Sequence, residues 1–153
     1  AVDAFGKLGA RGAPLVAQLA AHGVPVPIAV LARLGDRSAL EAALARDPDG
    51  VAADDVLLAA VDGGGHDLVE WLLAHGARAN ARASDRSRHT ALHEAAWKGD
   101  LRMTQILVTA GADLAARDEE HDATPRGWAE TSLEITHNDA CAEVAAYLAG
   151  IGG

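Results

Sequence analysis

The feature that most constrains this 153-residue chain is an internal repeat with a period of 35 residues. Small or apolar residues recur at this offset in five pairs: Leu57 and Leu92, Ala60 and Ala95, Gly64 and Gly99, Leu72 and Leu107, and Gly76 and Gly111. Five matches at one offset are unlikely by chance. A repeat of this length is typical of solenoid proteins, in which each unit buries its apolar face against its neighbours.

Each repeat is predicted to contain two short helices. In the best-preserved unit, residues 91–98 are rich in alanine and leucine, Gly99 interrupts them, and residues 101–109 resume with apolar residues at helical spacing. Thr90 is suited to an N-cap, and Gly99 and Gly111 to C-caps with left-handed backbone. The chain is 50% hydrophobic but only 3% aromatic. Such a composition favours an all-α fold packed through small side chains over a β-sandwich.

The most specific pattern lies at residues 89–118. Its opening, its paired alanines and its ending are Thr90-Ala91-Leu92-His93, Ala95-Ala96 and Gly111-Ala112-Asp113. This unit resembles an ankyrin repeat almost end to end. Residues 56–82 match the same template, and residues 123–129 resemble an opening variant seen in bacterial ankyrin proteins. The resemblance implies that the first helices and fingers form a protein-binding groove, and that His93 hydrogen-bonds to backbone between repeats.

We expect one ankyrin domain over residues 1–153, built from about five helix-turn-helix units. The unit boundaries are roughly 1–23, 24–47, 48–76, 77–111 and 112–152. The first fingers are expected to be shortened to turns, because the segments between Gly23 and Pro27 and between Asp47 and Asp55 are short. A capping box beginning at Ser38 is expected to start a second helix. Residues 130–140 are expected to add length between the two helices of the last unit.

Charge and hydropathy exclude several classes of function. The net charge is −9, which disfavours binding to nucleic-acid phosphates. No apolar stretch is long enough to cross a membrane, and we expect no signal peptide. The single cysteine, Cys141, allows no internal disulfide, which fits a cytoplasmic location. Only residues 77–118 are basic on balance, with seven basic and five acidic side chains.

No motif predicts catalysis, a metal or a cofactor. Although His89 and His93 are four residues apart, His89 precedes the expected helix and no carboxylate completes a zinc set. The run Gly63-Gly64-Gly65 lacks the Lys-Ser/Thr of a phosphate loop and is predicted to be an inter-helix turn. Because Gly63 has glycine neighbours, we expect it to tolerate a side chain better than Gly99 or Gly111.

Eight residues are candidates for contact with a partner: Arg78, Arg82, Arg86, Glu94, Trp97, Lys98, Glu120 and His121. Trp97 has the size and amphipathic character of a binding anchor, although packing against Trp128 is an equal alternative. The arginines could bind an acidic partner, or they could form ion pairs with the acidic finger at residues 117–122.

The expected function is therefore protein recognition through the groove and the two full fingers, by a monomer that needs no cofactor. The alternative is a regulatory or oligomerising ankyrin domain within a longer protein, for example one that is fused to an enzyme. A pocket for a small molecule is a third reading, which the scarcity of aromatic residues disfavours.

Overall fold

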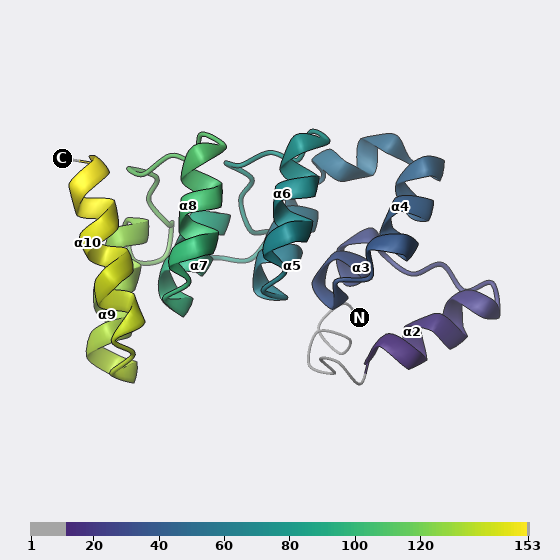
Figure 1. The fold of residues 1–153 in the computed structure, drawn as a ribbon, viewed down its shortest axis with the longest axis horizontal. Helices are drawn as coiled ribbons and strands as arrows, with labels where there is room; N and C mark the ends of the chain where they lie inside the picture. Colours follow the sequence, from purple (N-terminus) through teal and green to yellow (C-terminus); the bar gives the residue numbers. More distant parts are fainter. Residues whose placement is uncertain (1–11, 153) are drawn as a thin grey trace. The chain divides into compact units, whose positions relative to one another are not determined.

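A computed structural model describes residues 12–152 of the chain, and within them it contains nine α-helices and a 3₁₀ helix (Figure 1). The elements are α2 (Gly12–Ala21), α3 (Ile28–Leu34), α4 (Arg37–Arg46), η2 (Pro48–Ala52), α5 (Asp54–Asp62), α6 (His66–Ala74), α7 (Ala91–Lys98), α8 (Leu101–Thr109), α9 (Pro125–Thr136) and α10 (Ala140–Gly152). The described residues form no strand, only an isolated antiparallel bridge between Arg82 and Thr90. The predicted all-α fold is confirmed.

Two of the helix pairs, α3–α4 and α7–α8, are joined by a Gly-Asp turn that the sequence specifies locally. Gly35 and Gly99 end α3 and α7 with left-handed backbone, at φ of 72° and 69°. The aspartate that follows each glycine caps the next helix through its side chain. Asp36 accepts from the N–H of Ala39, and Asp100 accepts from the N–H of Met103. The expected capping box at Ser38 is therefore wrong, since α4 already begins at Arg37 under the Asp36 cap.

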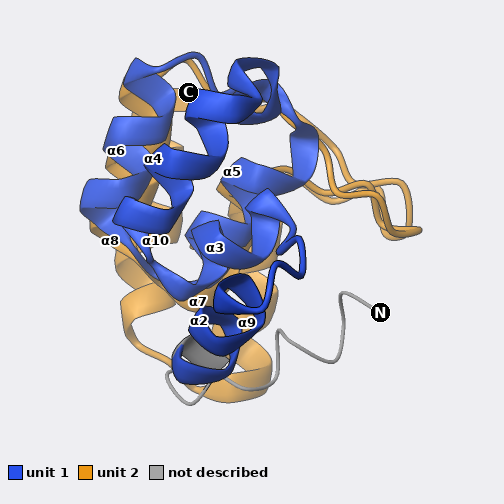
Figure 2. Cartoon of the chain, turned by 90° about the vertical axis from the view of Figure 1, so that its right-hand side faces the viewer, with its two compact units in different colours: residues 1–77 blue, residues 78–153 orange. Residues whose placement is uncertain are grey.

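The chain divides into two compact units, residues 1–77 and 78–153, which Figure 2 distinguishes by colour. In unit 1, the first helices α3 and α5 pack against each other, and the core is almost entirely aliphatic. Its fully enclosed side chains include Leu40, Leu57, Val69 and Leu72. Each such leucine contributes about 1.5–3 kcal/mol through removal from water.

The packing of α3 against α5 depends on Gly63. A Cβ placed there would lie only 2.2 Å from the backbone oxygen of Arg33. The reason for expecting Gly63 to tolerate a side chain better than Gly99 or Gly111 is therefore wrong, because the obstacle comes from the preceding repeat and not from its sequence neighbours. A Cβ at Gly99 would also approach backbone, at 2.9 Å from the nitrogen of Cys141. Gly111 meets nothing within 4 Å at this position, although its φ of +90° penalises any other residue.

Unit 2 contains two complete helix pairs and both long fingers. The first helices α7 and α9 pack together, and α8 and α10 are the second helices of the two pairs (Figure 1). Leu92, Met103, Leu107 and Val144 form its enclosed core. Ser132 ties α9 to α7 by donating a hydrogen bond to the backbone oxygen of Trp97 at 2.7 Å.

The two fingers of unit 2 run side by side and extend away from the helices (Figure 2). Asn80 links them, because its side-chain oxygen accepts from the N–H of Asp113 at 2.7 Å and its amide donates to the oxygen of Gly111 at 3.3 Å. A backbone–backbone hydrogen bond also links the fingers, from the N–H of Glu119 to the oxygen of Ser87 at 2.6 Å. These hydrogen bonds therefore hold each finger in place against the other.

Four of the expected repeats each contain one observed helix pair: α3–α4, α5–α6, α7–α8 and α9–α10. The exact boundaries of the repeats stay a prediction. In unit 1 the short segment between repeats forms η2 in place of a long finger, as expected. Residues 1–11 of the expected first unit, 1–23, lie outside the described residues. The extra residues of the last unit lengthen α9 to twelve residues, so most of them are helical and not a loop.

Candidate partner-binding site

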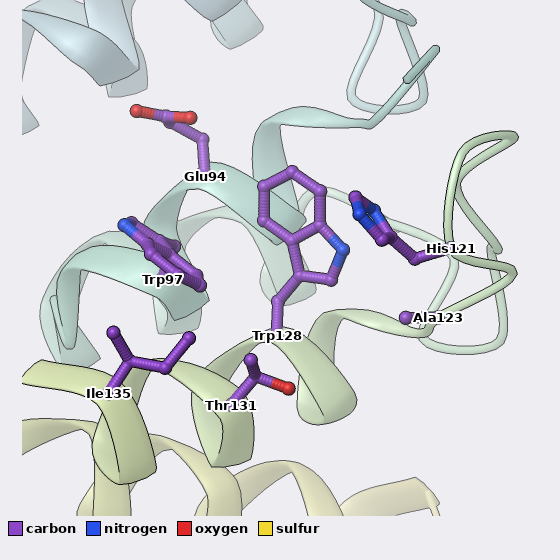
Figure 3. Close-up of a pocket in the computed structure, with 7 residues that line it drawn as sticks. All are labelled: Glu94, Trp97, His121, Ala123, Trp128, Thr131 and Ile135. Atoms are coloured by element: carbon purple, nitrogen blue, oxygen red, sulfur yellow. The ribbon is translucent and has the colours of Figure 1, made fainter.

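An open pocket of about 480 Å³ lies on unit 2, where α7, α9 and the second finger meet (Figure 3). Its wall is mostly apolar, and it contains two half-buried tryptophans and one isoleucine that is 66% exposed. The lining residues are Glu94 and Trp97 of α7, Trp128, Thr131 and Ile135 of α9, and His121 and Ala123 of the finger.

Trp128 is the fixed centre of this site. Its indole nitrogen donates a hydrogen bond to Asp118 Oδ2 at 2.9 Å, which orients the ring. The Trp97 ring meets it nearly edge to face, with centroids 6.0 Å apart and planes at 77°. The rings of His89 and His93 each lie 5.2 Å from it. Such aromatic contacts hold the pocket wall in place before any partner arrives.

Asp118 organises both Trp128 and the second finger. Its carboxylate is buried and accepts hydrogen bonds from the backbone N–H groups of Glu120, His121 and Ala123. Burial alone would raise the pKa of Asp118. The hydrogen bonds from the Trp128 indole and from the three amides outweigh burial and hold this pKa well below its usual value. The charged carboxylate therefore stabilises the finger at neutral pH.

Asp85 plays a similar part in the first finger. Its Oδ1 accepts from the hydroxyl of Ser87 at 2.7 Å and from the N–H groups of Ser87 and Arg88. The Ser87 hydroxyl is the main cause of a lowered pKa at Asp85, and nearby His89 adds to it while burial opposes it. Both fingers are thus held by an aspartate that satisfies backbone donors within the turn.

His93 connects successive repeats, as the family resemblance implies. The N–H of Thr90 donates to His93 Nδ1 at 3.1 Å, so Nδ1 is the acceptor and Nε2 carries the proton. Nε2 then donates to the backbone oxygen of Ala123 at 3.0 Å. Burial lowers the pKa of His93 against the opposing effect of the Ala123 hydrogen bond. The neutral ring is therefore the form that this arrangement requires.

The structure brings three of the eight predicted site residues to the pocket, namely Glu94, Trp97 and His121. A fourth, Lys98, lies beside it and pairs with Glu94 at 3.4 Å. Glu120 is exposed on the second finger. For Trp97 both interpretations hold together, because its ring packs against Trp128 and also lines the open pocket.

The arginines of the first finger lie outside the pocket lining. Arg82 donates to the backbone oxygens of Arg88 and Arg117 at 2.8 and 3.0 Å, so it braces one finger against the other. Arg88 lies 3.8 Å from Glu119 of the second finger. Arg78 and Arg86 are exposed. The side chains of Arg82 and Arg88 are therefore used in contacts between neighbouring fingers.

Sequence reasoning missed the half of the pocket that belongs to α9. Trp128 follows the capping residue Thr124 by the same interval at which Glu94 follows Thr90. Thr131 corresponds to Trp97 in the same way. The repeat register could therefore have identified both. The exposure of Ile135 could not be predicted in this way, because it depends on the lengthening of α9.

Within residues 12–152, no group of three or more His, Cys, Asp or Glu side chains could hold a metal ion. Cys141 is buried against the backbone of Trp97, with its sulfur 3.5 Å from that carbonyl oxygen. In the same part of the chain, no helix has the length and apolarity that crossing a bilayer requires.

Stacked helix pairs joined by short turns, finger loops between pairs, and a histidine that bridges repeats define a repeat protein of the ankyrin type. The chain belongs to the ankyrin repeat family, because the family model described as ankyrin repeats (3 copies) matches residues 28–118, more than half of its length. Ankyrin repeats are in general protein–protein interaction modules.

Two curated relatives are the human and mouse proteins named protein phosphatase 1 regulatory subunit 27. Each is 40% identical to the chain over 62 residues, which cover 40% of this chain and 35% of the relative. The match thus spans about a third of the length of these relatives.

Proposed function

We propose that this chain binds another protein through the face of unit 2 that contains the Trp97–Trp128 pocket. The observation that carries the proposal is the pocket itself, with two mutually packed tryptophans beside the exposed Ile135. Tryptophan is enriched among the residues that dominate binding energy at protein interfaces. An exposed isoleucine beside such a pair adds apolar area that a partner can cover.

The rigidity of the site supports the same proposal. Asp118 holds both Trp128 and the second finger, and His93 joins α7 to that finger. A surface ordered before binding loses little conformational entropy when a partner docks. We infer a docking mechanism in which the pocket and finger tips move little.

The finger tips extend the proposed surface. Arg82 and Arg88 contact the neighbouring finger, and an acidic region of the partner would meet Arg86, which is exposed on the first finger. We propose that such an acidic region contacts the first finger. Further candidates at the rim are Lys98, Glu120 and His121. We also propose that the chain acts as a monomer in the cytoplasm, without catalysis and without a cofactor.

The second candidate function is regulation of an enzyme. It is favoured by the similarity to relatives named as regulatory subunits of protein phosphatase 1. Calorimetric titration of the chain with protein phosphatase 1 tests it, with micromolar or tighter binding as the supporting result. Absence of a heat change at two temperatures, with both proteins at about 100 µM, would reject this phosphatase as the partner, because binding that buries apolar surface has an enthalpy that changes with temperature.

A photocrosslinking comparison tests the leading proposal. Benzoylphenylalanine is placed at Thr131, which lines the pocket, and in a matched variant at Gln105, which is exposed on α8. We expect a discrete crosslinked protein from a lysate of the source organism with the Thr131 variant alone. Crosslinking from Gln105 alone, or equally from both positions, would place the contact surface elsewhere.

A further inference from the structure

The pocket lining has the chemical character of a receptor for a positive charge. Glu94 provides its carboxylate, the seven lining residues include no lysine or arginine, and two indole rings meet at 77° in its wall. The face of an indole attracts a cation through its quadrupole. An indole face and a carboxylate at one opening are complementary to a cationic group.

The same chain contains an arginine held in this manner. In unit 1, the guanidinium carbon of Arg37 lies 5.1 Å from the centroid of the Trp71 ring, and its Nε donates to Glu41 at 2.8 Å. The planar guanidinium can stack on an aromatic ring and bond a carboxylate at the same time, which the ammonium of lysine does less well. This arrangement supplies a model for the occupant of the pocket in unit 2.

We propose that the pocket receives an arginine side chain of the protein partner. The guanidinium would stack on the Trp97 or Trp128 ring and bond Glu94, and its methylene stem would extend toward Ile135, which lies on the other side of Trp97 from Glu94 (Figure 3). This inference rests on the proposed function, because it specifies what a bound protein inserts at the same site. Its premise is the lining chemistry of the pocket and not the identity of the partner.

Charge around the pocket supports a cationic occupant. Residues 119–153, which include α9, carry seven acidic side chains and one basic side chain. Of these, Glu130 and Glu134 are exposed on α9. Lys98 Nζ lies 3.4 Å from one oxygen of Glu94 and His89 Nε2 lies 3.7 Å from the other, and both distances are long for an ion pair. An arriving guanidinium can therefore share or displace these contacts.

The test uses four synthetic pentapeptides of sequence Gly-Ser-X-Ser-Gly with blocked ends. X is arginine, lysine, citrulline or norleucine. Citrulline keeps the shape of arginine without its charge, and norleucine keeps only the apolar stem. Binding is followed at 0.15 M salt by NMR of the indole N–H signals of Trp97 and Trp128, with Trp71 as an internal reference because it already contacts Arg37.

The inference predicts that the arginine peptide shifts the Trp97 and Trp128 signals but not that of Trp71. Its affinity should exceed that of the citrulline peptide roughly tenfold, in line with a charge-assisted contact. Glu94→Gln should remove most of this preference. The matched control Glu130→Gln, which alters an exposed carboxylate paired with Arg126 outside the pocket lining, should retain it.

Three results would overturn the inference. They are equal affinity for arginine and citrulline, tighter binding of norleucine, and no response of Trp97 or Trp128 to any peptide. The peptide comparison on the unaltered chain does not depend on how the variants fold. The two proposals can fail separately. A specific crosslink from Thr131 together with no preference for arginine would support protein binding at the pocket and reject an arginine as the group that enters it.

Discussion

At the scale of single residues, close contacts between repeats limit substitution more than the conformation of the residue itself. Gly63 has an ordinary helical φ of −70°, whereas Gly64 has φ of +75° and open space around its Cβ position. Local geometry alone would single out Gly64 as the sensitive position. Because Gly63 lies so close to the Arg33 backbone, we expect Gly63 to be more sensitive to substitution than Gly64.

We therefore expect Gly63→Ala to cost about 2–3 kcal/mol, because α3 and α5 must separate to admit the methyl group. Gly64→Ala should cost only about 1 kcal/mol, for its positive φ. Urea unfolding of the two variants measures the difference. A variant at Gly64 that is less stable than the variant at Gly63 would show that the repeats do not meet as described.

His93 makes stability depend on pH. Its pKa is lowered in the folded state, so below an unfolded value of about 6.5 the unfolded chain binds a proton that the folded chain excludes. The stabilisation is complete above pH 6.5 and is lost as the pH falls through the folded pKa. Free energies of unfolding measured from pH 7.5 to 5 should decline in the unaltered chain.

His93→Gln should flatten that decline while costing about 1–2 kcal/mol at pH 7.5, since glutamine replaces the hydrogen bonds imperfectly. The exposed His22→Gln variant is the matched control and should keep the full pH dependence. If the pH profile of His93→Gln were unchanged, a different group would be responsible.

At the scale of elements, sequence and structure agree where a signal is local. The Gly-Asp turns, the helix start at Thr90 and the left-handed C-cap at Gly99 follow from residue types alone. The cap at Asp36 was not predicted, because the capping-box pattern that begins at Ser38 indicated a later helix start. In the structure the Asp36 side chain, which is nearer the turn, caps the helix. The course of α9 through residues 130–136 has no local signal that separates it from a loop.

Asn80 is the element-scale test of finger pairing. Asn80→Ala removes both hydrogen bonds to the second finger and should reduce the free energy of unfolding by about 1–2 kcal/mol. Amide hydrogen exchange at Asp113 should speed up, because its N–H loses its acceptor. The exposed Arg86→Ala variant serves as the control and should alter neither quantity. Unchanged exchange at Asp113 would mean that the fingers are ordered independently.

At the scale of the whole molecule, the repeat period predicted a solenoid, composition and helical spacing predicted the all-α class, and the motifs of residues 89–118 predicted the family. The pocket was only half predictable. Glu94, Trp97 and His121 stood out by residue type, whereas the contribution of Trp128 depends on how α9 aligns with α7. The first-finger arginines stood out by charge, but hydrogen bonding to neighbouring backbone, as at Arg82, cannot be read from charge.

The net charge of −9 and the locally basic finger lead to a prediction about association rates. Arg86→Glu should slow association with an acidic partner and reverse part of its acceleration at low salt, without affecting dissociation. Arg82→Glu is a poor test, because it would also break the contact between fingers. Stopped-flow mixing at two ionic strengths measures the effect, and an unaltered rate at low salt would exclude the first finger from the encounter.

The dissociation rate of the partner captured at Thr131 tests the central claim most directly. Trp97→Ala should raise that rate at least about tenfold, equivalent to roughly 1.4 kcal/mol, with little change in association rate. Trp71→Ala, which removes a tryptophan of unit 1, should leave both rates unchanged. If Trp97→Ala dissociates no faster than the unaltered chain while Trp71→Ala dissociates faster, the Trp97–Trp128 pocket is not the binding site.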